Sequence, residues 1–317
     1  MKKVILITST YNGSKYLPAL LDSILAQTYP YIDMVIRDDG STDNSVSIIK
    51  EYQKKFSTTE QKRIILVNEQ TNDWTNKGAH QSYHILIQGL EKADYYMGCD
   101  QDDVWMPTKV ERVVEHMSQY PDEVPVLYCH NYYICDGNLN IEGTIPERKN
   151  ISPEEMKNIN LANVIMTGTW AGVGMAQAFN HTLKQLTYHT GEFELSIALD
   201  CWVSWVVAGV GGALIYDSEP LAYYRRHDGT FSSGDAMGFA RYQDWKKHMK
   251  RHCSNITNGI HYFHKLYGSM VANKESLLFL ELFDSKNRLG KFFYPHRLRN
   301  NLLHEFAFRA LILLGKI

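Results

Sequence analysis

The first hundred residues alternate between short apolar runs and segments with helical periodicity, and this alternation constrains the fold more than any other feature. The expected strands are residues 3–8, 31–39, 62–69 and 94–100, and the expected helices are residues 16–27, 43–56 and 78–93. Strand–helix alternation with short connections is typical of a parallel sheet covered by helices on both faces. The sequence therefore predicts an α/β protein with a mostly parallel central sheet.

The pattern becomes less regular after Pro121. In chain order we expect a strand at 124–136, an irregular polar segment at 137–160, a glycine-rich stretch at 167–174 that leads into a helix, an apolar helix at 199–212, and a strand, turn and second strand at 213–227. From about residue 235 the pattern is helical. We divide the chain into residues 1–120 and 121–234, which share one sheet, and a C-terminal helical region, 235–317.

Composition excludes some classes of protein. The 317 residues carry a net charge of −2, so no global field attracts nucleic acid. The five cysteines form no C-x-x-C pair, which favours reduced thiols in a cytoplasmic protein. The apolar run at residues 4–7 is too short for a targeting segment. No run reaches the roughly 18 apolar residues that span a bilayer.

A polar cluster follows three of the predicted strands. The clusters are TSTYNG at 8–13, RDDGSTD at 37–43 and DQDD at 100–103. Ligands of open α/β sheets bind beyond the carboxyl ends of the strands. We therefore expect all three clusters on one rim, around one ligand.

The DQDD cluster indicates what that ligand is. Carboxylates this close raise one another's pKa unless a cation lies among them, and the usual cation is a divalent metal that binds a phosphate-bearing ligand. In an extended segment Asp100 and Asp102 point to the same side, while Asp103 faces away. The sequence has no P-loop and no complete G-x-G-x-x-G. These observations predict a nucleotide held by aspartates and a metal without a glycine cradle.

Three motifs carry a resemblance to a known family. The stretches STYNGSKYLPALLDSILAQT, IRDDGSTDNS and DQDDVWMPTK occur in this order. Together they resemble the family 2 glycosyltransferases with the A-type fold, and in particular the bacterial rhamnosyltransferases of surface polysaccharide synthesis. The resemblance covers roughly residues 3–234.

The resemblance implies an inverting transfer from a nucleotide-sugar with a divalent metal, Mn²⁺ or Mg²⁺. The implied donor is a dTDP- or UDP-sugar with rhamnose favoured, and the implied acceptor is a glycan or lipid-linked glycan. Residues 1–120 would then bind the nucleotide-sugar, and residues 121–234 the acceptor.

The resemblance also assigns donor-side residues. Thr10, Tyr11 and Asn12 would line the base pocket, Asp39 would hold the base edge, Asp100 would contact the ribose, Asp102 and His227 would bind the metal, and Arg225 or Arg226 would contact phosphate oxygens. Arg226 stands where the family has Gln. On the acceptor side, a loop would include Thr167, Gly168 and Trp170, with Trp170 as a stacking surface for a sugar.

Asp200 is the predicted catalytic base. A lone aspartate in the apolar helix LDCWVSW is costly unless it is paired or functional. Inversion needs a base that takes the acceptor proton opposite the departing nucleotide, and the family's acidic–aromatic segment lies at this place. The alternative is a helix-capping role near the start of the helix. Leu199 departs from the Glu or His that family members often carry before the base.

The C-terminal region carries a separate signal. Leu302, Phe306, Ala310 and Leu313 are compatible with one helical face, and basic residues are frequent at 286–309. An amphipathic basic helix lies on an anionic membrane surface, covers the sheet or forms a homodimer contact. The first alternative would make the protein peripheral on the inner face of the cell membrane.

Two other functions remain as alternatives. A sugar nucleotidyltransferase would need a basic, glycine-rich triphosphate loop, which TSTYNGSK at residues 8–15 does not provide. A non-catalytic nucleotide- or glycan-binding module would keep the polar rim but would not need Asp200.

Overall fold

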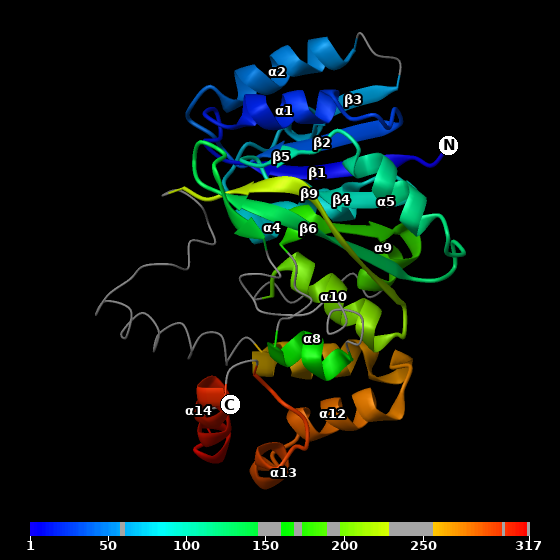
Figure 1. Ribbon diagram of the computed structural model, residues 1–317, viewed down its shortest axis with the longest axis vertical. Helices are drawn as coiled ribbons and strands as arrows, with labels where there is room; N and C mark the ends of the chain where they lie inside the picture. The colour runs from blue at the N-terminus through cyan, green and yellow to red at the C-terminus, as the bar shows by residue number, and fades with distance from the viewer. Residues whose placement is uncertain are drawn as a thin grey trace.

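The described strands of the protein form a single sheet. A computed structural model describes residues 1–57, 61–144, 160–167, 173–188, 197–227, 256–299 and 302–315. The strands are β1 (Val4–Thr10), β2 (Ile32–Asp38), β3 (Lys62–Leu66), β4 (Tyr95–Gly98), β5 (Val104–Trp105), β6 (Val126–Cys135), β7 (Ile141–Thr144), β8 (Gln177–Asn180) and β9 (Ala213–Arg225). They occupy the upper part of the molecule in Figure 1.

The sheet is parallel in its first half and mixed in its second half. The strand order is β3-β2-β1-β4-β8-β6-β9-β5, and β7 pairs with β6 outside this path. The first four strands run parallel, as the strand–helix alternation predicts. β8 then runs antiparallel between β4 and β6, and β9 lies parallel to β6 and antiparallel to β5. The carboxyl ends of β1, β2 and β4 therefore meet at one edge.

Helices cover both faces of the sheet, which confirms the predicted fold class. The helices are α1 (Leu17–Leu25), α2 (Ser45–Phe56), α3 (Val67–Thr71), α4 (Ala79–Gly89), α5 (Lys109–Met117), α8 (Leu161–Thr167), α9 (His181–Thr187), α10 (Leu199–Gly209), an unlabelled helix at 256–267, α12 (Lys274–Asp284), α13 (Arg288–Phe292) and α14 (Leu302–Leu313). The 3₁₀ turns are η1 (Gly174–Ala176) and η2 (Gly268–Met270).

Two apolar cores lie on the two sides of the sheet. Successive residues of β1 alternate between them, since Leu6 packs with α1, α2 and α5, while Ile5 and Ile7 pack with α4, α9 and α10. Two local features favour the observed helix starts. Pro18 lies in the first turn of α1, and the Asn180 side chain accepts from Leu183 N at the start of α9. Alternating burial thus explains the layered arrangement.

The second core extends from α10 into the C-terminal helices. Trp202 of α10 is fully buried and lies 5.5 Å, ring centre to ring centre, from Phe263 in helix 256–267. Phe263 in turn stacks on Tyr267 at 4.7 Å. α8, α12 and α14 pack on the same core, and Figure 1 shows them at the end of the molecule farthest from α2. This aromatic cluster packs α10 against helix 256–267.

The structure corrects three details of the sequence prediction. The glycine-rich stretch does not lead into a helix: after η1 the chain enters β8, whose four residues are all buried between β4 and β6. β9 is one continuous strand in place of a strand, turn and strand, and its register shifts against β6 near Asn131 absorb the expected turn. The third strand ends at Leu66, and α3 takes over the last residues assigned to it.

None of the helices in the described ranges is long and apolar enough to cross a membrane.

Candidate active site

A cavity of about 660 Å³ lies where the carboxyl ends of β1, β2 and β4 meet. The amino-terminal ends of α4 and α10 close it from the other sides. Five of the residues predicted for the site line this cavity: Tyr11, Asp39, Asp100, Asp102 and Asp200. They come from segments far apart in the chain, so the structure brings the predicted rim and the predicted base into one chamber.

The DQDD segment follows β4 and separates Asp103 from the other two carboxylates, although it does so through a turn at Gln101 and Asp102 and not through an extended segment. Asp100 and Asp102 line the cavity, whereas Asp103 is fully buried behind it and accepts from Arg225 N at 3.2 Å. Burial raises the pKa of the Asp100 carboxyl to about 6, and the Asp102 carboxylate adds to this rise. The Tyr83 hydroxyl opposes it by donating to Asp100 Oδ1 at 2.8 Å. The negative charge is therefore concentrated on the ligand side.

Lys109 lies behind the aspartates in the protein interior. Its ammonium group donates to Met175 O at 2.6 Å and lies 3.4 Å from the centre of the Trp105 ring. Burial lowers the pKa of Lys109 to about 7, and the carboxylates of Asp103 and Asp100 oppose that shift. In its protonated form, Lys109 offsets part of the repulsion within the acidic segment.

Asp102 and His227, the predicted metal ligands, lie next to each other, although only Asp102 lines the cavity. His227 Nε2 lies 2.9 Å from Asp102 Oδ2, which is the distance of a hydrogen bond between the two side chains. Tyr16 supports the arrangement, because its ring lies 4.6 Å from the imidazole and carries the Arg225 guanidinium 4.6 Å from its centre. The described residues hold no group of three His, Cys, Asp or Glu side chains suited to a metal ion. Further ligands would have to come from a bound substrate or water.

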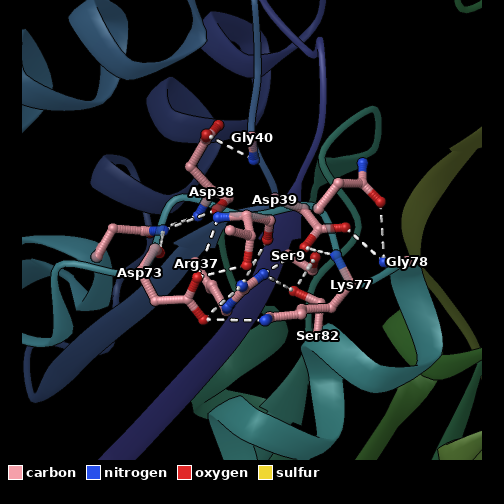
Figure 2. A network of polar contacts seen from close by, with 12 residues as sticks. Ser9, Arg37, Asp38, Asp39, Gly40, Asp73, Lys77, Gly78 and Ser82 are labelled. Carbon is pink, nitrogen blue, oxygen red and sulfur yellow. Dashed lines mark hydrogen bonds and ion pairs between the residues drawn. The ribbon is translucent and has the colours of Figure 1, made fainter.

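Asp39 is held by a buried polar network, shown in Figure 2. Arg37 Nη1 pairs with Asp39 Oδ1 and also donates to Ser82 Oγ at 3.1 Å. The same carboxylate accepts two main-chain N–H groups, from Lys77 to Oδ1 and from Gly78 to Oδ2, both at 2.8 Å. Asp39 therefore joins β2 to the start of α4 and still faces the cavity.

Arg37 fastens the segment before α4 at two further points. Its Nη2 donates to Thr75 O at 2.9 Å and lies 3.4 Å from Asp73 Oδ2. The guanidinium is almost completely buried. Arg37 and Asp39 thus together attach the loop that forms this cavity wall to the sheet.

Asp200 lies in the first turn of α10 and lines the cavity. Its Oδ1 accepts from Cys201 N at 2.8 Å, and Ala198, not Asp200, occupies the N-cap position. Burial raises the pKa of the Asp200 carboxyl, and the N–H of Cys201 acts in the opposite direction. The carboxylate is thus oriented by the helix start while it faces the chamber.

Several predicted residues lie beside the cavity without lining it. Thr10 Oγ1 donates to Gln101 Oε1 at 2.6 Å, and Asn12 Oδ1 accepts from Thr42 N at 2.8 Å, so both stabilise loop conformations. Gln101, which sequence reasoning did not assign, lines the cavity and accepts from Tyr11 N at 3.0 Å.

The predicted phosphate-binding arginines also lie outside the cavity lining. Arg225 Nε donates to Asp102 O at 2.8 Å, and its Nη1 donates to Gly137 O at 2.7 Å. Arg226 Nη1 lies 3.7 Å from Glu142 Oε2. Because neighbouring residues of a strand point to opposite faces, Tyr224 and not Arg225 lines the cavity. On the acceptor side, Thr167 ends α8, and Gly168 and Trp170 lie outside the described residues.

α4 contributes cavity residues that the sequence analysis missed. Ala79, His80, Tyr83 and Ile87 all line the chamber. They share one helical face, since residues three and four positions apart are neighbours on a helix. The spacing was visible in the sequence, but only the sheet order shows which face meets the rim.

A close backbone approach shapes the cavity floor and leads to a prediction. A Cβ on Gly98 would lie 2.3 Å from Gly174 O, whereas a Cβ on Gly89 would meet nothing within 4 Å. We expect Gly98→Ala to lower the free energy of unfolding by about 1–3 kcal/mol through steric overlap. The matched Gly89→Ala should be neutral or slightly stabilising. Urea denaturation of both variants measures the difference, and equal stabilities would contradict the close contact.

Comparison with solved structures identifies the fold. Despite low identity, the structure resembles that of S. aureus TarS in complex with UDP-GlcNAc, with a TM-score of 0.56, 16% identity, and coverage of 99% of this chain and 80% of that one. A mannosyltransferase from Pyrobaculum calidifontis in complex with GDP-Man and Mn²⁺ gives a TM-score of 0.54 at 15% identity, covering 100% and 81%. These likenesses show the A-type glycosyltransferase fold.

Sequence comparison identifies the family. The profile of glycosyl transferase family 2 matches residues 5–183, more than half of the 317 residues. The chain therefore belongs to this family, which confirms the resemblance carried by the three motifs.

Two relatives show how far the similarity extends. An uncharacterized glycosyltransferase from a Nostoc species is 32% identical over 237 residues, covering 71% of this chain and 65% of that protein. A dTDP-rhamnosyl transferase from Shigella flexneri is 33% identical over 109 residues, covering 34% and 35%. The matched part of the chain thus spans less than two thirds of either relative.

Proposed function

We propose that the protein is an inverting, metal-dependent glycosyltransferase that moves a sugar from a nucleotide-diphosphate sugar to a glycan or lipid-linked glycan in bacterial surface polysaccharide synthesis. The observation that carries this proposal is the placement of Asp100, Asp102 and Asp200 around one cavity. The favoured donor is a dTDP- or UDP-sugar with rhamnose. The Shigella relative supports that choice by its name, and the donors in the two structural neighbours support the broader nucleotide-sugar class.

The nucleoside would occupy the β1–β2–β4 side of the cavity. Tyr11 presents an exposed ring at the rim, and Asp39 Oδ2 carries one main-chain hydrogen bond and retains a lone pair for a base N–H. Asp100 would accept from a ribose hydroxyl, with Tyr83 fixing its other contact. These residues bind and orient the donor.

The residues at Asp102 and His227 fit a divalent ion. A carboxylate oxygen and an imidazole nitrogen suit Mn²⁺, and Mg²⁺ also binds through one or two carboxylates together with substrate phosphates. When bound, such an ion would neutralise the charge that develops on the departing diphosphate. Tyr16 and Arg225 keep the two ligands in place.

Asp200 would act as the general base. As the acceptor oxygen bonds to the anomeric carbon, the acceptor hydroxyl proton passes to the Asp200 carboxylate. The bond between the anomeric carbon and the diphosphate oxygen breaks, and its electron pair leaves with the nucleotide. The hydrogen bond from Cys201 N orients the carboxylate, and the apolar wall of α10 limits its solvation.

Nucleotide binding provides the direct test. We expect UDP or dTDP with Mn²⁺ to raise the melting temperature, while GDP and CDP give smaller shifts. At 100 times the dissociation constant the gain is about 2.7 kcal/mol, which corresponds to roughly 5–10 °C. Asp102→Asn and His227→Ala should remove the metal-dependent part of the shift, whereas Asp122→Asn, which changes an exposed carboxylate, should retain it. No shift with any of the four nucleotides would contradict the proposal.

A further inference from the structure

The C-terminal helix α14 carries an apolar stripe that faces solvent. Leu302, Phe306 and Leu313 are 58%, 71% and 41% exposed. Their spacing places them, with the exposed Ala310, on one side of the helix, and the opposite side packs Phe308 into the core. Among the alternatives left open by the sequence, the structure thus disfavours a stripe that covers the sheet.

A second exposed apolar element adjoins α14. Leu289 and Phe293, in and just after α13, are 64% and 72% exposed. Arg309 of α14 joins the two elements, because its guanidinium donates to Phe292 O and, at 3.0 Å, to His296 O. In Figure 1, α13 and α14 lie together at the lower end of the molecule. We call the exposed apolar side chains of these two elements the C-terminal apolar surface: Leu289, Phe293, Leu302, Phe306, Leu313 and Leu314.

The segments that carry this surface are basic. Residues 286–299 and 302–315 contain six Lys and Arg and a single acid, Glu305. Glu305 is buried and accepts from Leu298 N, Arg299 N and Arg309 Nε, so it contributes no exposed negative charge. The exposed cations are Lys286, Arg288 and Arg297.

The adjoining helix α12 carries three acids, of which Glu281 is exposed and the other two contact histidines. Glu275 of α12 lies 3.4 Å from His296, and Asp284 accepts from both His261 and His264. Apolar side chains therefore project beside a set of lysines and arginines. This combination is the one that amphipathic elements use at anionic lipid surfaces.

We propose that the C-terminal apolar surface docks the protein on the anionic headgroups of a phospholipid bilayer, with Phe293 and Phe306 entering the interface. A second copy is the less favoured occupant, because a symmetric contact would bring the same cations face to face. A neutral apolar partner would leave Lys286, Arg288 and Arg297 without opposite charge. The inference goes beyond sugar transfer and does not depend on it.

Vesicle sedimentation tests the apolar part. The full chain should sediment with vesicles of equal parts phosphatidylglycerol and phosphatidylcholine, and added NaCl should weaken this binding. Phe293→Ser combined with Phe306→Ser should lower the apparent affinity at least tenfold. Ile141→Ser changes a 55% exposed apolar side chain on β7 and should leave binding unchanged.

A charge variant tests the electrostatic part and avoids the apolar substitutions. Lys286→Gln, Arg288→Gln and Arg297→Gln together should lower binding to the anionic vesicles at least tenfold. Their effect on the weak binding to pure phosphatidylcholine should be small. The matched Lys50→Gln, Lys54→Gln and Lys55→Gln, which together remove three exposed cations from α2, should bind like the unchanged protein.

The outcomes separate the occupants. Absence of sedimentation with anionic vesicles, or equal binding by the unchanged chain and both sets of variants, would overturn the proposal. A dimer in vesicle-free solution that the serine variant converts to a monomer would assign the surface to a second copy. The nucleotide-dependent thermal shift, measured in the same variants, should be unchanged. If the unchanged protein shows no nucleotide-dependent thermal shift, that result counts against the proposed reaction and not against membrane docking.

Discussion

Asp200→Asn is expected to lower sugar transfer by roughly a thousandfold while nucleotide binding stays nearly the same. General bases contribute about 10²–10⁴ in rate, and the amide cannot accept the acceptor proton. The substitution keeps the size of the side chain and an oxygen that can accept from Cys201 N. Transfer is measured as release of the free nucleotide with a glycan acceptor, and binding as the thermal shift.

The control for Asp200→Asn removes an acid from an equivalent place in another helix. Glu275 lies in the first turn of α12 and does not line the cavity, so Glu275→Gln should retain transfer. Normal transfer by Asp200→Asn would contradict the proposed role of Asp200 as general base. Loss of nucleotide binding together with transfer would point to a structural role at the start of α10.

Arg37→Met should produce the largest loss of stability among the substitutions considered. It leaves the buried Asp39 carboxylate without its charged partner and releases the contacts to Thr75 and Asp73. Breaking a buried ion pair by removing one partner costs about 3–5 kcal/mol, which corresponds to a fall in melting temperature of roughly 10 °C. Urea denaturation and thermal melting measure the change.

A pair with an exposed arginine on the same sheet provides the comparison, because the buried Asp33 carboxylate keeps a second partner, Lys3 Nζ at 3.1 Å. Arg63 donates to both oxygens of Asp33, and its side chain is 60% exposed. Arg63→Met should therefore cost less than about 1 kcal/mol. If the two methionine variants lose equal stability, the burial of the Arg37–Asp39 pair does not explain the loss caused by Arg37→Met.

The elements that the sequence predicted well are those whose own side chains determine them. The apolar runs of β1 to β4 and the amphipathic helices between them were recognisable because their periodicity follows from burial on known faces. β8 was not, since Gln177–Asn180 carries little intrinsic strand preference and is held by partners on both sides. Pairing with strands that are distant in the sequence determines the conformation of such a segment.

The residues of the candidate site also fall into those that the sequence predicted and those that it did not. Motif spacing was enough to bring Asp39, Asp100 and Asp102 to one rim, because strand ends in a parallel sheet share an edge. Arg37 was missed, although an arginine directly before two aspartates in a buried strand is a signal for an internal ion pair. Tyr83 depends on how α4 is rotated against the sheet, which no local pattern specifies.

The shared duties of Asp39 affect how this protein could change its donor during evolution. One carboxylate accepts from Arg37, Lys77 N and Gly78 N, so replacing it would disturb the loop, the helix start and the ligand contact together. Such a position resists adaptive substitution even when a different base would be advantageous. Lineages that acquire a new nucleotide preference should therefore keep this aspartate and vary Tyr11 and Asn76, which border the same cavity from its exposed rim.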